Sequence, residues 1–177
     1  MSELDFRRLE DEGLETGPSD RAGRTLVIAC GALAREILAV LDANRWTYID
    51  LACLPAKLHN QPHLIPEKAR QRIRRARADG YGNVYLAYAD CGTGGLLDRV
   101  CAEEGVERIE GPHCYSFFDG NDEFSRRSAE GEITAFYLTD FLARQFDTLI
   151  WKGLGLDRHP DLLPMIFGNY EKIVYLA

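Results

Sequence analysis

Short apolar runs alternate with helix-like patterns along most of this chain. Five runs have the length and composition of buried strands: Thr25–Ala29, Thr47–Cys53, Val84–Ala89, Val106–Ile109 and Ile173–Ala177. Between them, apolar residues recur at helical spacing and predict helices over residues 32–44, from Pro66 onward, and after Gly95. This alternation predicts an α/β fold: a three-layer, mostly parallel open sheet with helices on both faces, Rossmann-like in architecture.

The last third of the chain shows a different pattern. Glu132–Trp151 is predicted as the longest helix, with Thr139 and Asp140 as a polar interruption, and Pro160–Phe167 as a short helix that Gly168 ends. Residues 121–131 are polar and predict a loop or a short helix.

The pattern also predicts how the chain is divided. Residues 1–24 have few apolar positions and no sustained periodicity, which is typical of a flexible tail. Residues 25–177 are expected to form a single α/β domain. Because its final strand runs to the last residue, we expect that domain to lack part of its C-terminal end.

Composition narrows the classes of function. The net charge of −7 over 177 residues disfavours a general nucleic-acid binder. The exception is the helix from Pro66, whose exposed positions are arginine-rich; it is interpreted as a solvated face or as a docking face for an acidic partner or RNA. The chain shows no apolar run of membrane-spanning length and no export signal, so we expect a cytoplasmic protein without membrane contact.

The cysteines carry the chemistry that the sequence suggests. Five cysteines without an export signal are expected to be reduced thiols, ligands or nucleophiles. Cys30, Cys91 and Cys114 each follow a predicted strand, and parallel strands bring such ends to one edge of the sheet. Three thiols at one point, with a coordination position left open for a small-molecule substrate, predict zinc or an iron–sulfur cluster. Cys53 and Cys101 are interpreted as core residues.

Several polar residues adjoin these thiols. Asp90 and His113 stand next to candidate ligands, and His59 with Asn60 lies in a loop between two prolines. Asp90, His113 and His59 are predicted to act as general acids or bases. A glycine-rich turn follows Cys91 and is predicted to bind substrate or cofactor together with Asn60; its residues are Gly92, Thr93, Gly94 and Gly95. A capping role for Asp90 and a plain tight turn are the structural alternatives.

Two other functions remain open from the residues alone. One is nucleophilic catalysis by Cys91, activated at the start of the following helix and assisted by His113. The other is a non-catalytic accessory module that captures a small anion or cofactor on the Cys91 turn and docks through its arginine-rich helix.

Six ordered motifs resemble a known family. They are ACGALAREI (29–37), LPAKLHNQP (54–62), YADCGTGG (88–95), HCYSFF (113–118), FYLTDFLARQFD (136–147) and FGNYEKIVYLA (167–177). Together they resemble the DUF1638 family over residues 25–177. The resemblance implies no established activity; it implies a setting near corrinoid-dependent methyltransferases of one-carbon metabolism, and hence a corrinoid or methyltransferase protein as partner.

Overall fold

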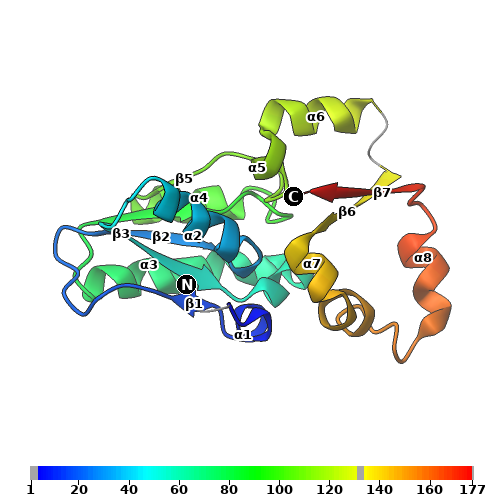
Figure 1. The fold of residues 1–177 in the computed structure, drawn as a ribbon, viewed down its shortest axis with the longest axis horizontal. Helices are drawn as coiled ribbons and strands as arrows, with labels where there is room; N and C mark the ends of the chain where they lie inside the picture. The colour runs from blue at the N-terminus through cyan, green and yellow to red at the C-terminus, as the bar shows by residue number, and fades with distance from the viewer. Residues whose placement is uncertain (1–3, 131–133, 177) are drawn as a thin grey trace. The chain divides into compact units, whose positions relative to one another are not determined.

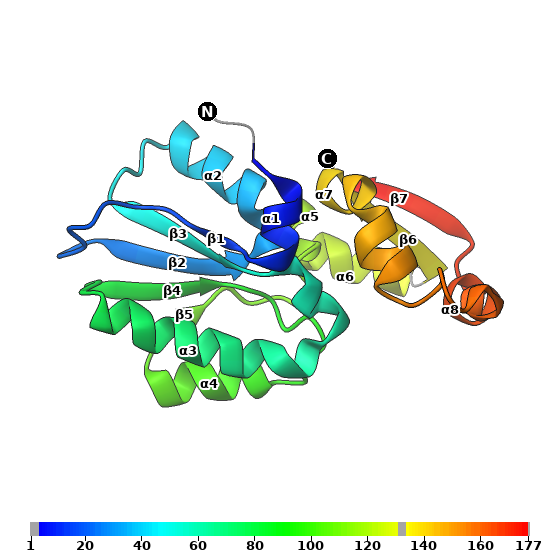
Figure 2. The ribbon, with the colours of Figure 1, turned by 90° about the horizontal axis from the view of Figure 1, so that it is seen from below.

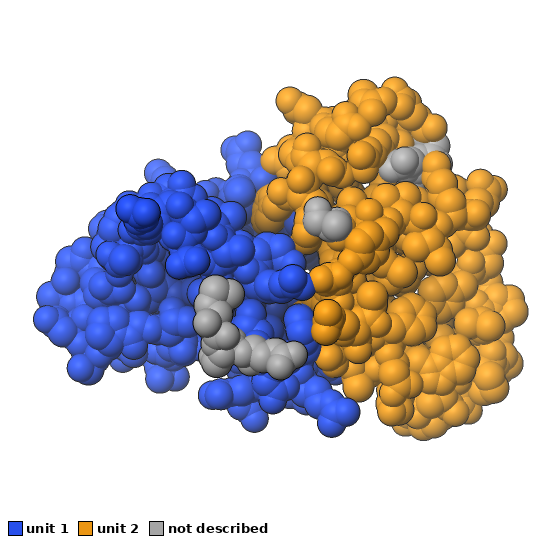
Figure 3. Space-filling model, viewed as in Figure 1, with its two compact units in different colours: residues 1–114 blue, residues 115–177 orange. Residues whose placement is uncertain are grey.

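The computed structural model describes residues 4–130 and 134–176. The chain divides into two compact units, residues 1–114 and residues 115–177 (Figure 3). The single domain expected over residues 25–177 stays a prediction. In the described residues, the strands after Cys114 pair with each other and form a sheet of their own.

Unit 1 is built on a five-stranded sheet within residues 4–114 (Figure 1). The strands are β1 (Leu14–Glu15), β2 (Thr25–Cys30), β3 (Ile49–Leu54), β4 (Asn83–Ala87) and β5 (Glu107–Arg108). Their order is β1-β3-β2-β4-β5, and every pairing is parallel except that of β1 with β3. The prediction of a mostly parallel α/β sheet is confirmed in this coarse form.

Helices cover the unit 1 sheet on two sides. Figure 2 shows α2 (Ala34–Ala43) on one side of the sheet and α3 (Ile65–Ala78) with α4 (Leu96–Glu104) on the other. Short 3₁₀ turns connect these elements: η1 (Gly31–Leu33), η2 (Ala56–Asn60) and η3 (Pro62–Leu64). Side chains of the central strands, such as Leu26, Ile28 and Leu86, are fully buried beneath the helices. Burial of such apolar side chains drives this packing.

The described part of residues 1–24, the stretch predicted to be a flexible tail, contains a helix and a strand. Asp5 caps helix α1 (Phe6–Asp11), accepting hydrogen bonds from the N–H groups of Arg7 and Arg8. Strand β1 then pairs with β3, and Thr16 donates its N–H to the Leu51 carbonyl at 2.8 Å. Residues 1–3 lie outside the described part. The sequence does not predict this helix and strand because polar residues dominate the segment: among its described residues, Leu9 is the one apolar side chain that is buried.

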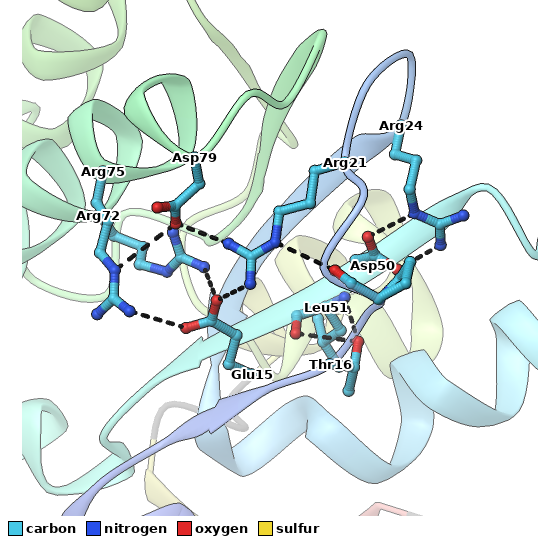
Figure 4. Close-up of polar contacts among 10 residues, drawn as sticks. Glu15, Thr16, Arg21, Arg24, Asp50, Leu51, Arg72, Arg75 and Asp79 are labelled. Carbon is cyan, nitrogen blue, oxygen red and sulfur yellow. Dashed lines mark hydrogen bonds and ion pairs between the residues drawn. The ribbon is translucent and has the colours of Figure 1, made fainter.

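Ion pairs hold the N-terminal segment where the parallel strands begin. Figure 4 shows Arg21 between Glu15 and Asp79, at 3.0 and 2.7 Å, and Arg24 on Asp50. The Arg24 Nε lies 2.7 Å from the Asp50 carboxylate, whose side chain is only 3% exposed. A nearly buried carboxylate needs such a partner, because an unpaired buried charge is strongly destabilising.

Unit 2 differs most from the sequence prediction. Its elements are α5 (Ser116–Asp119), α6 (Asn121–Ala129), β6 (Ala135–Thr139), α7 (Asp140–Arg144), the π-helical η5 (Asp147–Lys152), η6 (Pro160–Leu162), α8 (Leu163–Phe167) and β7 (Lys172–Leu176). Strands β6 and β7 pair in parallel, which confirms the final strand up to Leu176; Ala177 lies outside the described residues.

The long helix predicted over Glu132–Trp151 is wrong. Residues 132 and 133 lie outside the described part, Ala135–Thr139 is strand β6, and a helix begins only at Asp140. The Thr139 hydroxyl caps that helix, accepting the N–H of Leu142 at 3.2 Å. A run of alternating aromatic and apolar residues favours a strand when a partner strand is present, and the Thr-Asp pair ends it with a cap.

Among the described residues, none of the helices has the length and apolar character needed to cross a membrane.

Candidate functional site

The strand ends of unit 1 bring the predicted cysteines into one region. Strand β2 ends at Cys30, and β4 is followed by Tyr88 to Cys91. These two strands are neighbours, and the chain order reverses there: β3 lies on one side of β2, and β4 and β5 on the other. In open α/β sheets, the carboxyl ends of strands at such a reversal are where ligands bind.

Cys91 and Cys114 form a close pair of free thiols. Their Sγ atoms lie 3.1 Å apart, and the backbone N–H of Cys114 also donates to the Cys91 sulfur at 3.3 Å. The two segments are aligned by backbone hydrogen bonds, from Asp90 N–H to the Gly111 carbonyl and from Cys91 N–H to the Pro112 carbonyl. The contact between the sulfurs is therefore fixed by the backbone around it.

The backbone of Cys91 is strained. Its φ is +46°, in the left-handed region that non-glycine residues rarely adopt. Gly92, the next residue, has a φ of +85°. Strain of this kind persists only where the surroundings enforce it, and it concentrates at functional sites.

The surroundings of Cys91 favour its thiolate. The hydrogen bond with the Cys114 thiol lowers the pKa of Cys91 below its ordinary value. The Cys114 N–H and the charge of Arg108 act in the same direction, against the effects of burial and of the Asp90 charge. The same thiol–thiol hydrogen bond, with burial, raises the pKa of Cys114 well above its ordinary value. Because the Cys114 N–H also donates to the Cys91 sulfur, we assign Cys91 as the acceptor and Cys114 as the donor of the hydrogen bond between the thiols.

Cys30 belongs to the same cluster but has a different character. Burial raises its pKa to about 11, although the Ala32 N–H and the Tyr88 hydroxyl both donate to its sulfur. Tyr88 is 1% exposed, and its electrostatic partners include all three cysteines, Cys30, Cys91 and Cys114. The tyrosine is thus close enough to interact with all three thiols, and Cys30 is a protonated thiol at neutral pH.

Asp90 and the glycine-rich turn satisfy each other. The Asp90 carboxylate accepts hydrogen bonds from the Thr93 hydroxyl at 2.7 Å and from the N–H groups of Gly94 and Gly95 at 3.1 and 2.8 Å. Partial burial opposes ionisation, but these donors outweigh it and hold the pKa of Asp90 below its ordinary value. The N–H groups predicted to bind a substrate anion already hold this carboxylate. Asp90 therefore shapes the turn and presents Cys91.

The two predicted loop histidines meet edge to face. The ring centroids of His59 and His113 lie 5.2 Å apart. Desolvation, with a smaller contribution from His59, lowers the pKa of His113 to about 4, and desolvation also lowers the pKa of His59. Both rings are neutral at pH 7, so neither supplies a positive charge to Cys91. Asn60, at the end of η2, is half-buried.

Comparison with known protein families shows which family the chain belongs to. The family described as protein of unknown function (DUF1638) matches residues 53–177, well over half of the sequence. The chain belongs to the DUF1638 family. No curated protein and no solved structure matches it. Cys91, Cys114 and the residues around them lie within the matched region, whereas Cys30 lies before it.

The described residues of this DUF1638 protein contain no group of three or more histidine, cysteine or acidic side chains placed to hold a metal ion. The pair at the centre also fits a metal poorly. Two thiolates on one zinc lie about 3.8 Å apart, given Zn–S bonds near 2.3 Å, whereas Cys91 and Cys114 are 3.1 Å apart.

Tyr88 and Arg108 are site residues that the sequence reasoning missed. Arg108 donates to the backbone carbonyls of Tyr88 and Ile109 at 3.3 and 2.9 Å, which fixes its charge near Cys91. The signal was present for both: each stands at or just beyond the end of a strand that precedes a candidate cysteine. Tyr88 was counted only as part of an apolar run.

The arginine-rich face of α3 is neutralised within unit 1 of this DUF1638 chain. Glu104, on α4, accepts from Arg70, Arg74 and Arg77, and Glu15 pairs with Arg72 and Arg75. Acidic side chains of the same unit thus hold the charges that a docking face for an acidic partner would offer.

Cys53 and Cys101 behave as the core residues that the sequence predicts. Both are buried, and burial raises the pKa of each thiol.

Proposed function

We propose that this DUF1638 protein is a thiol-dependent enzyme in which Cys91 is the nucleophile and a small electrophilic molecule is the substrate. The observation that carries the proposal is the Cys91 sulfur, which lies 3.1 Å from the Cys114 sulfur and accepts the Cys114 N–H while the Cys91 backbone is held at a positive φ. A thiolate stabilised by fixed donors is the form of cysteine that attacks electrophiles.

The strand order supports a substrate site at Cys91. We infer a doubly wound, Rossmann-like arrangement, because the strand order β3-β2-β4-β5 reverses between β2 and β4 and helices lie on both sides of the sheet (Figure 2). Cys30 and Cys91 follow the two strands that flank the reversal. A substrate would approach this edge of the sheet and meet Cys91 there.

The neighbouring residues take supporting roles in this proposal. Cys114 donates to the Cys91 sulfur, Arg108 supplies positive charge, and the Asp90 carboxylate holds the turn that presents Cys91. His113 is neutral and adjoins Cys114, so its contribution is to shape the site and not to ionise Cys91.

Alkylation of the full chain tests the proposal, with the other cysteines as internal controls. Trypsin releases each cysteine in a separate peptide, with Cys91 in residues 78–99 and Cys101 in residues 100–108. At pH 7 we expect iodoacetamide to modify Cys91 at least about tenfold faster than Cys30, Cys53 or Cys101, because their raised pKa values leave them protonated. Equal rates at all these sites would overturn the assignment.

The predicted zinc or iron–sulfur site at Cys30, Cys91 and Cys114 stays a prediction, and the same experiment addresses it. Coordinated thiolates react only after the metal is removed, so a chelator would accelerate alkylation at all three sites together. A free nucleophile reacts at the same rate with and without chelator. Methyl donors of corrinoid-dependent one-carbon metabolism are electrophiles of the proposed class, and a corrinoid or methyltransferase partner likewise stays a prediction.

A further inference from the structure

We infer that Cys91 and Cys114 are a redox-sensitive pair that closes a reversible disulfide when a peroxide oxidises Cys91. The inference deepens the proposed function, because the nucleophilic sulfur of that proposal is the sulfur that becomes oxidised. It assigns to Cys114 the role of resolving thiol, the residue that removes the oxidised form of its neighbour.

Proximity of the sulfurs is the first argument. The two Sγ atoms lie 3.1 Å apart, within reach of bond formation after a small approach, since a disulfide bond is about 2.05 Å long. Both cysteines are free in the structure. The pair is therefore described in its reduced form.

The backbone keeps the two thiols together without the help of a bond between them. Asp90 and Cys91 donate their N–H groups to the carbonyls of Gly111 and Pro112 at 2.9 and 3.1 Å. The N–H of Cys114 returns to the Cys91 sulfur at 3.3 Å. A resolving thiol held in this way reaches the oxidised sulfur faster than any thiol in solution.

The chemistry proceeds in two steps. The Cys91 thiolate attacks one oxygen of hydrogen peroxide; an S–O bond forms, the O–O bond breaks, and hydroxide leaves and takes a proton to become water. The Cys114 sulfur then attacks the resulting sulfenic acid on Cys91. The S–S bond forms, the S–O bond breaks, and the departing hydroxide combines with the Cys114 proton as a second water. Two electrons pass from the two thiols to one peroxide.

Cys30 is the alternative partner, and its surroundings argue against it. Its sulfur accepts hydrogen bonds from the Ala32 N–H and the Tyr88 hydroxyl, and its thiol stays protonated at neutral pH. The Cys114 sulfur, in contrast, lies 3.1 Å from the Cys91 sulfur, and the Cys114 N–H donates to that sulfur. The pairing is therefore expected to be specific for Cys91 with Cys114.

Peptide mapping after peroxide treatment tests the inference. The full chain is treated with a small excess of hydrogen peroxide, blocked, digested with trypsin without reductant, and analysed for linked peptides. We expect residues 78–99 linked to residues 109–126, which carry Cys91 and Cys114. The link should form equally in Cys30→Ser and Cys101→Ser, and should disappear in Cys114→Ser and in Cys114→Ala. Dithiothreitol should reverse it and restore alkylation of Cys91.

The outcomes separate this inference from the proposed function. A link from Cys91 to Cys30, or sulfenic and sulfinic acid accumulating on Cys91 while Cys114 stays reduced, overturns the disulfide even when reduced Cys91 alkylates rapidly. Slow alkylation of Cys91 in the reduced chain overturns the nucleophile itself, whatever the peroxide experiment shows. Circular dichroism of each variant establishes that it is folded before its thiols are compared.

Discussion

The parallel strands of the unit 1 sheet begin at one edge of the sheet, the first edge, and end at the opposite one, the second edge. Different kinds of interaction are found at these two edges. Where the parallel strands begin, charged side chains meet opposite charges, as Arg24 does on Asp50 and Arg21 on Asp79 (Figure 4). Where the strands end, thiols meet one another and a buried tyrosine. The paired charges are explained by the stability they give. The backbone strain at Cys91 costs stability, so we look for function at the second edge.

Removing Arg24 should give the largest effect at the first edge. Arg24→Met leaves the nearly buried Asp50 carboxylate without its partner, and we expect the melting temperature to fall on the order of 10 °C. The matched control is Lys57→Met, which breaks an exposed pair with Asp11 and should shift the melting temperature by about 2 °C or less. Thermal denaturation followed by circular dichroism measures both.

The same variant separates the two edges. In folded Arg24→Met, the rate of Cys91 alkylation should stay within about twofold of the wild type, because no hydrogen bond to the Cys91 sulfur comes from the network around Arg24. A parallel loss of stability and of thiol reactivity would show that the two edges are coupled, and would contradict the comparison.

Removing the thiol of Cys114 should give the next largest effect. Cys114→Ala deletes the thiol donor that contributes most to the lowered pKa of Cys91, so that pKa rises and the thiolate fraction at pH 7 falls. A rise of one pKa unit reduces that fraction about tenfold, and the rate of alkylation should fall with it. Cys114→Ser keeps a hydroxyl donor and should lose only about threefold. The midpoint of the alkylation rate plotted against pH gives the pKa of Cys91 directly in each variant.

An unchanged midpoint in Cys114→Ala would place the origin of the shift elsewhere, in the Cys114 N–H or in Arg108, both of which remain in that variant. The further substitution Arg108→Met would then decide between the Cys114 N–H and the charge of Arg108, because it removes the charge and leaves the backbone in place.

Much of unit 1 was predictable because its strands and helices carry their own periodicity. The runs around Leu26, Leu51 and Leu86 are buried as their composition indicates. The direction of the strands was also predictable, since parallel strands with helical crossovers bring their carboxyl ends to one edge. The positions of Cys30 and Cys91 after β2 and β4 follow from that rule alone.

The rest depended on contacts that no local pattern encodes. Strand β6 exists because β7 pairs with it, more than thirty residues later in the chain, and its aromatic residues read equally well as one face of a helix. The hydrogen bonds of Asp90 were hidden for a similar reason: a carboxylate next to a glycine-rich turn looks the same in sequence whether it awaits a substrate or accepts the N–H groups of the turn, as it does here. The Cys91–Cys114 contact arises from backbone pairing between two loops.

The smallest expected effect concerns His113 and sharpens the distinction between shaping the site and ionising Cys91. At pH 7.5, His113→Asn should alkylate at Cys91 within about twofold of the wild-type rate, because a ring with a pKa of about 4 is already neutral there. A larger loss would restore His113 as a base or as a positive partner of the thiolate.

The stability of the protein at acidic pH gives a second test of His113, and the direction of the expected change follows from the shift of its pKa on folding. The pKa of His113 is about 4 in the folded chain, against about 6.5 when unfolded. Between these values the unfolded state binds more protons, so the stability present above pH 6.5 is lost as the pH falls toward 4. His113→Asn removes this contribution, and its melting temperature should decline less over that interval than that of the wild type.

His159→Asn, at an exposed position of unit 2, is the matched control, and its melting temperature should decline as that of the wild type does. Equal declines in all three proteins would mean that His113 titrates normally, and the ring would then be available to charge beside Cys114 at mildly acidic pH.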